Sequence, residues 1–179
     1  MKQFVTSATT LGLIFAFSVT MLCANETNTK TKTVTKSAPV PHCEVPCGIY
    51  ADQMRFEMML EDTATIAKAI ASVNEIAGGF DAGPPNAKTI NQMTRWINTK
   101  ESHATNTQHI VAQYFMTQRI KADKDGYAKQ LAAAHKVMVC AMKCKQDADP
   151  KTAEALKAAI YDLYRAYEGK EPKFNDAKK

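Results

Sequence analysis

Apolar residues recur every three to four positions through most of the chain after residue 51, which is the spacing of one helix face. Short polar or Gly- and Pro-containing stretches separate four such segments. They predict helices over residues 52–77, 86–121, 127–145 and 150–168. Gly78-Gly79 ends the first helix, residues 81–85 form a loop, and Pro150 suits the first position of the fourth helix. No stretch alternates with period two for long enough to predict a strand.

The same periodicity assigns an apolar face to each predicted helix. The faces comprise Phe56, Met59, Leu60, Ile66, Ala67, Ile70, Val73 and Ala77; Ile90, Met93, Ile97, Ala104, Val111, Tyr114 and Phe115; Leu131, Met138 and Met142; and Leu156, Ala159, Ile160, Leu163 and Tyr167. Four helices with short connections predict an all-α protein, an antiparallel up-and-down four-helix bundle over residues 51–169. The second helix is the longest, so we expect it to overhang its neighbours or to pack against another subunit. Residues 170–179 form a polar tail.

The first 41 residues differ in composition from the rest. Lys2 precedes an apolar run at residues 11–22, which is shorter than the roughly 20 residues that span a bilayer. It predicts a signal peptide over residues 1–24, hence an exported protein of the periplasm or the extracellular space, without a membrane anchor after processing. A retained anchor and a lipid on Cys23 are the alternatives. Residues 25–41, rich in Thr and Lys, predict a disordered pro-segment.

The charge balance argues against nucleic acid as a partner. The chain has a formal net charge of +5, but residues 42–179 hold 19 basic and 17 acidic side chains. Nucleic-acid-binding domains usually carry a strongly basic face. The near-neutral body of this chain does not predict one.

The densest chemistry lies between the leader and the first helix, in the sequence His-Cys-Glu-Val-Pro-Cys-Gly-Ile-Tyr at residues 42–50. One imidazole and two thiols occur within six residues, at His42, Cys43 and Cys47. Pro46 restricts the backbone and Gly48 frees it, which predicts a tight loop. Spacing alone leaves open a disulfide, a metal site or a redox thiol pair, and in an exported protein it favours the disulfide.

The whole string, however, resembles the nickel hook of nickel superoxide dismutases. In that family the motif begins the mature chain, exposed by proteolysis, and leads into a four-helix bundle. All the fixed positions of the motif agree: His42, Cys43, Pro46, Cys47, Gly48 and Tyr50. Glu44 departs from the pattern, because Asp is common there. Pro41 precedes the cleavage point, where signal peptidase requires a small residue, so the resemblance implies a dedicated maturation protease.

This resemblance implies a ligand set and an activity. The α-amine of His42, the amide nitrogen of Cys43 and the thiolates of Cys43 and Cys47 would surround nickel in a square plane, with the His42 imidazole as the axial ligand of the oxidised ion. Anionic sulfur and nitrogen donors stabilise nickel(III) and suit tetragonal nickel(II). The implied reaction converts two superoxide anions into oxygen and hydrogen peroxide by Ni(II)/Ni(III) cycling. The implied assembly is a homohexamer.

Further roles also come from the resemblance. Tyr50 would screen the metal and order water or an anion, although hydrophobic packing is an alternative, and Pro46 would be a cis-proline. Glu57 would hydrogen-bond the axial imidazole through a basic partner, or else be a solvated helix charge. Carboxylates commonly orient a metal-bound histidine. Lys100 and Arg95 are the candidate basic partners.

Two competing functions use the same residues differently. The hook could serve an exported metal-binding or metal-delivery protein without turnover, or Cys43 and Cys47 could form a disulfide in a helical interaction domain.

Structural roles are predicted for the remaining residues of interest. Cys140 and Cys144 are expected to be buried thiols or a structural pair. The scattered His103, His109 and His135 are predicted to be packing or surface residues. For Met54, Met58 and Met59, packing in the helix core is favoured over copper binding.

Overall fold

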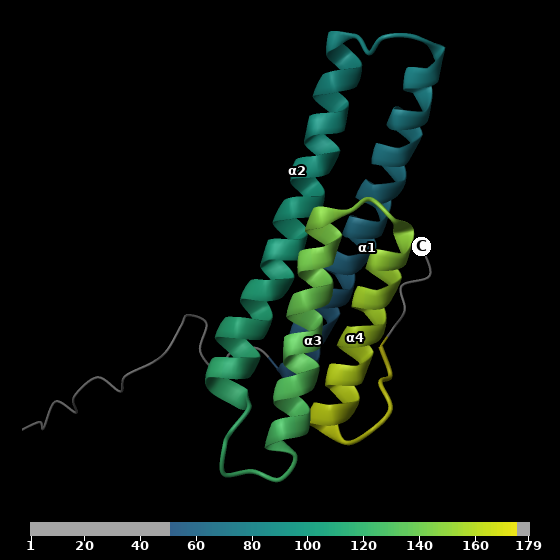
Figure 1. Ribbon diagram of the computed structural model, residues 1–179. Coiled ribbons are helices and arrows are strands. Elements are labelled where there is room, and N and C mark those ends of the chain that lie inside the picture. The colour runs from purple at the N-terminus through teal and green to yellow at the C-terminus, as the bar shows by residue number, and fades with distance from the viewer. Residues whose placement is uncertain (1–50, 175–179) are drawn as a thin grey trace, which may run out of the picture. The chain divides into compact units, whose positions relative to one another are not determined.

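The computed structural model describes residues 51–174, which form an antiparallel four-helix bundle (Figure 1). Its elements are α1 (Asp52–Gly78), η1 (Gly79–Ala82), α2 (Ala87–His109), η2 (Ile110–Arg119), α3 (Tyr127–Gln146) and α4 (Pro150–Glu168). The predicted all-α bundle is confirmed. The loop predicted over residues 81–85 starts later, because the 3-10 turn η1 follows directly on α1.

Side chains and backbone conformation at the helix ends explain the boundaries. Asn86 Oδ1 accepts a hydrogen bond from the Thr89 amide at 3.0 Å and begins α2. Asp149 Oδ1 accepts from the Lys151 amide at 2.9 Å, and Pro150 takes the first position of α4. Gly169, with φ of +68°, adopts the left-handed conformation that ends α4. These are local signals, so the sequence alone could locate them.

The predicted second helix contains a change of geometry. From Ile110 to Arg119 the chain forms a π-helix, η2, and the amide of Ile120 bonds the carbonyl of Phe115 at 2.8 Å, five residues earlier. In an α-helix, side chains five positions apart point about 140° away from each other. The wider turns of a π-helix bring them onto one side, which matters for Tyr114 and Arg119 below.

The core joins all four helices. The predicted faces of α1 and α4 are largely confirmed, except that Ala67 and Ala77 are exposed. Fully buried residues of these two helices include Phe56, Met59, Ile66, Ile70, Leu156, Ile160 and Leu163. The Phe56 ring contacts several aromatic rings: Phe115 at a centroid distance of 4.6 Å, Tyr164 at 5.0 Å, Tyr167 at 6.1 Å and Phe174 at 6.3 Å. Phe174 of the predicted polar tail therefore folds back onto the bundle.

The predicted apolar face of the third helix is confirmed only in part, since Met138 packs against the core and Leu131 is half-buried. The buried residues of α3 are Ala134, Val137, Cys140, Ala141 and Cys144. Met142 of the predicted face is 40% exposed. The large side chains dominated the apolar pattern, but small ones face the interior and let α3 approach its neighbours closely.

The first half of α2 also differs from its predicted face. Ile90 and Ile97 are exposed, because α1 and α2 extend as a hairpin past the connection between α3 and α4 (Figure 1). Asn74 Nδ2 donates to the Ala148 carbonyl at 2.9 Å and so joins that connection to α1. The overhang expected from the length of the second helix is confirmed. We call this extended part of α1 and α2, with the connection between them, the overhang.

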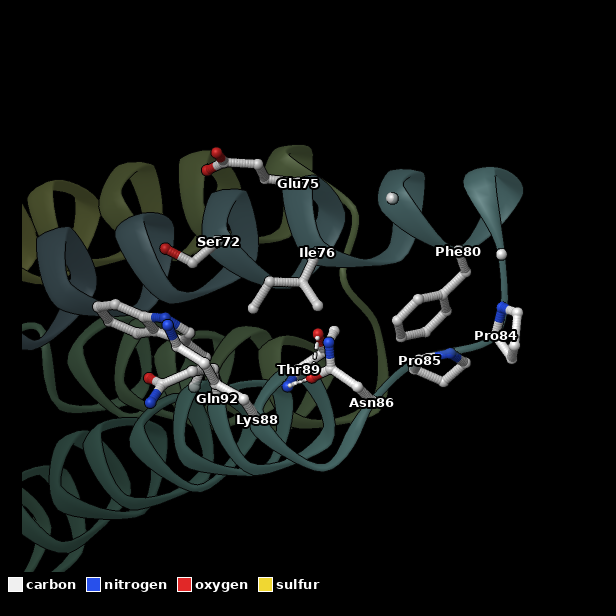
Figure 2. Close-up of a pocket in the computed structure, with 13 residues that line it drawn as sticks. Ser72, Glu75, Ile76, Phe80, Pro84, Pro85, Asn86, Lys88, Thr89 and Gln92 are labelled. Atoms are coloured by element: carbon white, nitrogen blue, oxygen red, sulfur yellow. Dashed lines mark hydrogen bonds between the residues drawn. The ribbon is translucent and has the colours of Figure 1, made fainter.

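A pocket of about 730 Å³ lies between the two helices of the overhang (Figure 2). Ile76 and Phe80 line it from the α1 side, and Trp96 and Thr89 from α2. The Gly83–Pro85 connection closes its outer end. Phe80 and Ile90 are exposed in this part of the hairpin.

Two buried charged groups hold α2 in register with its neighbours. The Asp62 carboxylate of α1 accepts hydrogen bonds from His103 Nδ1 at 2.6 Å, Asn106 Nδ2 at 2.7 Å and Thr107 Oγ1 at 3.3 Å. Lys100 Nζ donates to the last carbonyls of α3, those of Cys144 at 2.5 Å and Lys145 at 2.6 Å. These partners lie on other helices, and Lys100 also pairs with Glu101 of its own helix at 3.5 Å. A shift of one helix along another would therefore deprive buried charged groups of hydrogen-bond partners.

The buried ammonium group gives a stability prediction. Lys100→Met keeps the length of the side chain but leaves two buried carbonyls without their donor, so we expect the free energy of unfolding to fall by about 1–3 kcal/mol. Urea unfolding followed by circular dichroism measures the change. The matched control is Lys68→Met on the exposed side of α1, for which we expect almost none. Equal stability of the two variants would contradict this role of Lys100.

Candidate functional site

The predicted ligands His42, Cys43 and Cys47, together with Tyr50, lie outside the described residues. We call residues 42–50 the hook segment. The described chain begins directly after it, and α1 starts at Asp52. The structure therefore defines the base to which the hook segment is joined.

The side chain of Asp52 is the centre of a polar cluster at this base. Asp52 Oδ1 accepts a hydrogen bond from Tyr114 Oη at 2.5 Å, and Oδ2 accepts one from Tyr167 Oη at 2.7 Å. Arg119 Nε lies 3.0 Å from Oδ1 as an ion pair, and Arg119 Nη2 donates to Tyr114 Oη at 2.8 Å. We call these four residues the Asp52 cluster. It joins the first turn of α1 to η2 and α4.

Local chain geometry explains why these groups meet. Ala51, at the N-cap of α1, offers no capping side chain, and Asp52 supplies the negative charge that the positive end of a helix dipole favours. Tyr114 and Arg119 lie five residues apart and converge because η2 has π geometry. Tyr167 comes from the last turns of α4.

Positive charge gathers around the Tyr114 ring. The Arg119 guanidinium carbon lies 4.9 Å from the ring centroid, and that of Arg55 lies 5.0 Å from it. Such contacts are favourable because the face of an aromatic ring is electronegative. Two guanidinium groups therefore lie against the Tyr114 ring at the base of the hook segment.

The two phenols of the cluster hold their protons strongly. Burial, followed by the hydrogen bond to Asp52, raises the pKa of Tyr114, and the same two causes raise the pKa of Tyr167. The hydrogen bond with Tyr114 is the main reason that the pKa of Arg119 is also raised. Both tyrosines therefore remain donors to the carboxylate at neutral and mildly alkaline pH.

The residues that the resemblance suggested as hydrogen-bond partners of the His42 imidazole are not part of the Asp52 cluster. Glu57 is exposed and accepts from Gln53 Nε2 at 2.9 Å. Lys100 is engaged at the end of α3, and Arg95 is exposed on the overhang. The role of Glu57 toward the imidazole of His42 stays a prediction, because it depends on a residue outside the described range.

The other candidates have structural positions. Cys140 and Cys144 are buried free thiols, as expected, and burial raises the pKa of both. His103 is held by Asp62, while His109 and His135 are exposed. The three methionines range from the exposed Met54 through Met58 to the fully buried Met59. Within residues 51–174, no three His, Cys, Asp or Glu side chains are grouped to hold a metal ion.

Comparison with known proteins decides the family. The family model for nickel-containing superoxide dismutase matches residues 34–171, a range that includes the hook segment and all four helices. The chain belongs to this family. It is therefore a nickel-dependent superoxide dismutase, an oxidoreductase whose substrate is superoxide and whose cofactor is nickel. The same comparisons found no match among curated proteins or solved structures.

None of the described helices has the length and hydropathy needed to cross a membrane.

Sequence reasoning missed the Asp52 cluster. Tyr114 and Tyr167 were expected only as parts of apolar helix faces, and Arg119 was not singled out. An acidic residue at a predicted helix start is a common feature, and the five-residue spacing of Tyr114 and Arg119 does not indicate contact in an α-helix. The π geometry of η2 was the missing information.

The raised pKa values predict a loss of stability at high pH. A phenol whose pKa is higher in the folded state than its ordinary value of about 10 stabilises the fold below that pH. This contribution disappears as the pH rises through the folded-state pKa. We therefore expect some of the six tyrosines to ionise above pH 10 in the folded protein, as followed by absorbance at 295 nm. In denaturant all six are expected to titrate together, and Tyr167→Phe to remove part of the late transition. Identical folded and denatured curves would disprove the prediction.

Proposed function

We propose that this dismutase binds nickel at the N-terminus of a processed chain that begins at His42. The ligands are the α-amine and imidazole of His42, the amide nitrogen and thiolate of Cys43, and the thiolate of Cys47. The observation that carries the proposal is the family match, which spans a hook segment agreeing with the family's motif at every fixed position.

The chemistry of these donors fits nickel. Thiolate sulfur combined with nitrogen in a tetragonal arrangement suits nickel(II). A free α-amine has an ordinary pKa near 8, so a metal ion readily displaces its proton. In an uncleaved chain the nitrogen of His42 would be an amide, a far weaker donor. Removal of residues 1–41 is thus a chemical requirement of the site.

Bound nickel supplies a one-electron couple, Ni(II)/Ni(III), through which one superoxide is oxidised to oxygen and a second, with two protons, is reduced to hydrogen peroxide. The residues of the chain adjust that couple and the access to it. The thiolates of Cys43 and Cys47 donate electron density, and the His42 imidazole favours the higher oxidation state. Tyr50 screens the site.

Export and assembly complete the proposal. Residues 1–24 direct export to the periplasm or the extracellular space, and a dedicated protease removes the pro-segment after Pro41. The mature chain assembles as a homohexamer. Phe80, Ile90 and Ile97, exposed on the overhang, offer apolar surface for contact between subunits.

The start of the active chain is the first test. We expect active protein to begin at His42, because only a free amine there completes the ligand set. N-terminal sequencing or intact mass measurement of active protein identifies the start. As a control, a chain retaining Pro41 is expected to lack both nickel and activity. Full activity of a chain that begins at residue 25 or at Met1 would refute the proposed ligands.

The second test separates catalysis from metal delivery. His42→Gln on a correctly processed chain keeps the amine and both thiolates, so we expect near-normal nickel content. Loss of the imidazole nitrogen, which would favour the higher oxidation state of nickel, is expected to lower dismutase activity at least about tenfold, which corresponds to ~1.4 kcal/mol of activation free energy. Nickel per chain and superoxide decay after pulse radiolysis measure the two effects. A delivery protein would instead lose metal retention, and unchanged activity would rule out an axial role for His42.

A further inference from the structure

We infer that Asp52 is a positioning residue for the nickel hook. Its carboxylate fixes the first turn of α1, and with it the attachment of the hook segment, to η2 and α4. The inference rests on the proposed function, since it assigns a task to the base of the proposed ligand segment. It concerns residues that the structure describes and that the motif does not include.

Chain length places the cluster close to the proposed ligands. Cys47 lies five residues before Asp52, and five residues span at most roughly 17 Å. The direction and mobility of the chain at Asp52 therefore limit the positions that Cys47 can occupy. Ala51 provides no capping side chain, and the carboxylate of Asp52 joins this turn to η2 and α4 by hydrogen bonds.

The carboxylate of Asp52 has contacts at both of its oxygens. Both oxygens accept phenolic hydrogen bonds, from Tyr114 at 2.5 Å and from Tyr167 at 2.7 Å, and Arg119 adds an ion pair at 3.0 Å. The side chain is only 26% exposed, which reduces screening by water. Charge-assisted hydrogen bonds of this kind are stronger and more directional than neutral ones.

Different residues of α1 position the hook segment and hold the helix in the bundle. Phe56 and Met59 are fully buried and secure α1 in the bundle from its second turn onward. The contacts of Asp52 act on the turn before them, which leads into the hook segment. Removing the carboxylate is therefore expected to free the attachment of the hook far more than it weakens the bundle. Nickel would then have to order a more mobile chain on binding.

The experiment uses the mature chain that begins at His42, with nickel(II) alone as the probe. Asp52→Ala removes all three contacts. We expect its affinity for nickel, measured by competition with a chelator, to fall at least about tenfold. In the nickel-free chain we expect faster hydrogen exchange over residues 47–54, with exchange in the rest of α1 nearly unchanged and a fall in the thermal midpoint no larger than that of Lys100→Met.

Three further variants make the result specific. Tyr167→Phe removes one hydrogen bond and keeps the ring, so a smaller loss of affinity is expected with the fold intact. Asp162→Ala removes a carboxylate that pairs with Lys136 and Arg165 away from the hook, and normal nickel affinity is expected. Lys100→Met destabilises the bundle at the end of α3 and controls for a general loss of stability.

Each outcome is decisive. Unchanged nickel affinity and exchange in Asp52→Ala would overturn the inference, as would an equal loss of affinity in Lys100→Met. If Asp52→Ala failed to fold, unchanged affinity in Tyr167→Phe would overturn it, and the smaller loss would support it. A wild-type mature chain that bound no nickel would refute the proposed function itself. Normal binding by the wild type together with normal binding by both cluster variants would refute only the role of Asp52.

Discussion

Burial of the Phe56 ring holds together the end of the bundle from which the hook segment extends. The ring is fully buried and lies within 4.6–6.3 Å, between centroids, of four rings contributed by η2, α4 and the segment after α4. Aromatic contacts of this kind combine a large buried area with preferred tilted geometries. Once Phe56 is placed, the first turn of α1 has a defined origin and direction. The Asp52 cluster can form only because that origin lies beside Tyr114 and Tyr167.

Buried charged side chains then specify how the helices align. Asp62 joins α1 to α2, and Lys100 joins α2 to the end of α3. Apolar packing alone tolerates small shifts along a helix, whereas a buried charge that loses its partner incurs a large desolvation cost. Two distinct ends result: the base of the hook segment, held by rings and by Asp52, and the overhang of α1 and α2, where apolar residues remain exposed. The first suits a fixed site, and the second suits contact with another chain.

Family membership and the geometry of the bundle address different parts of the function. The match to nickel-containing superoxide dismutases establishes the activity and the metal. The donors that we propose belong to a short segment whose proposed chemistry requires a free α-amine at His42. The bundle does not supply those donors. Its contribution is a base of defined position, at which Arg55 and Arg119 lie against the Tyr114 ring.

Local patterns in the sequence determined the helices, their ends and the family. Apolar spacing, Asn86, Pro150 and Gly169 act over one or two turns, and the hook motif is contiguous, so each could be read without the fold. Only the tertiary structure decided which face of α3 is buried, since Ala134 and Ala141 carry almost no apolar signal and their burial depends on the approach of neighbouring helices. It also decided the Asp52 cluster, whose members are separated by up to 115 positions. Their meeting depends on the π geometry of η2 and on helix packing, and neither is encoded in a short stretch of sequence.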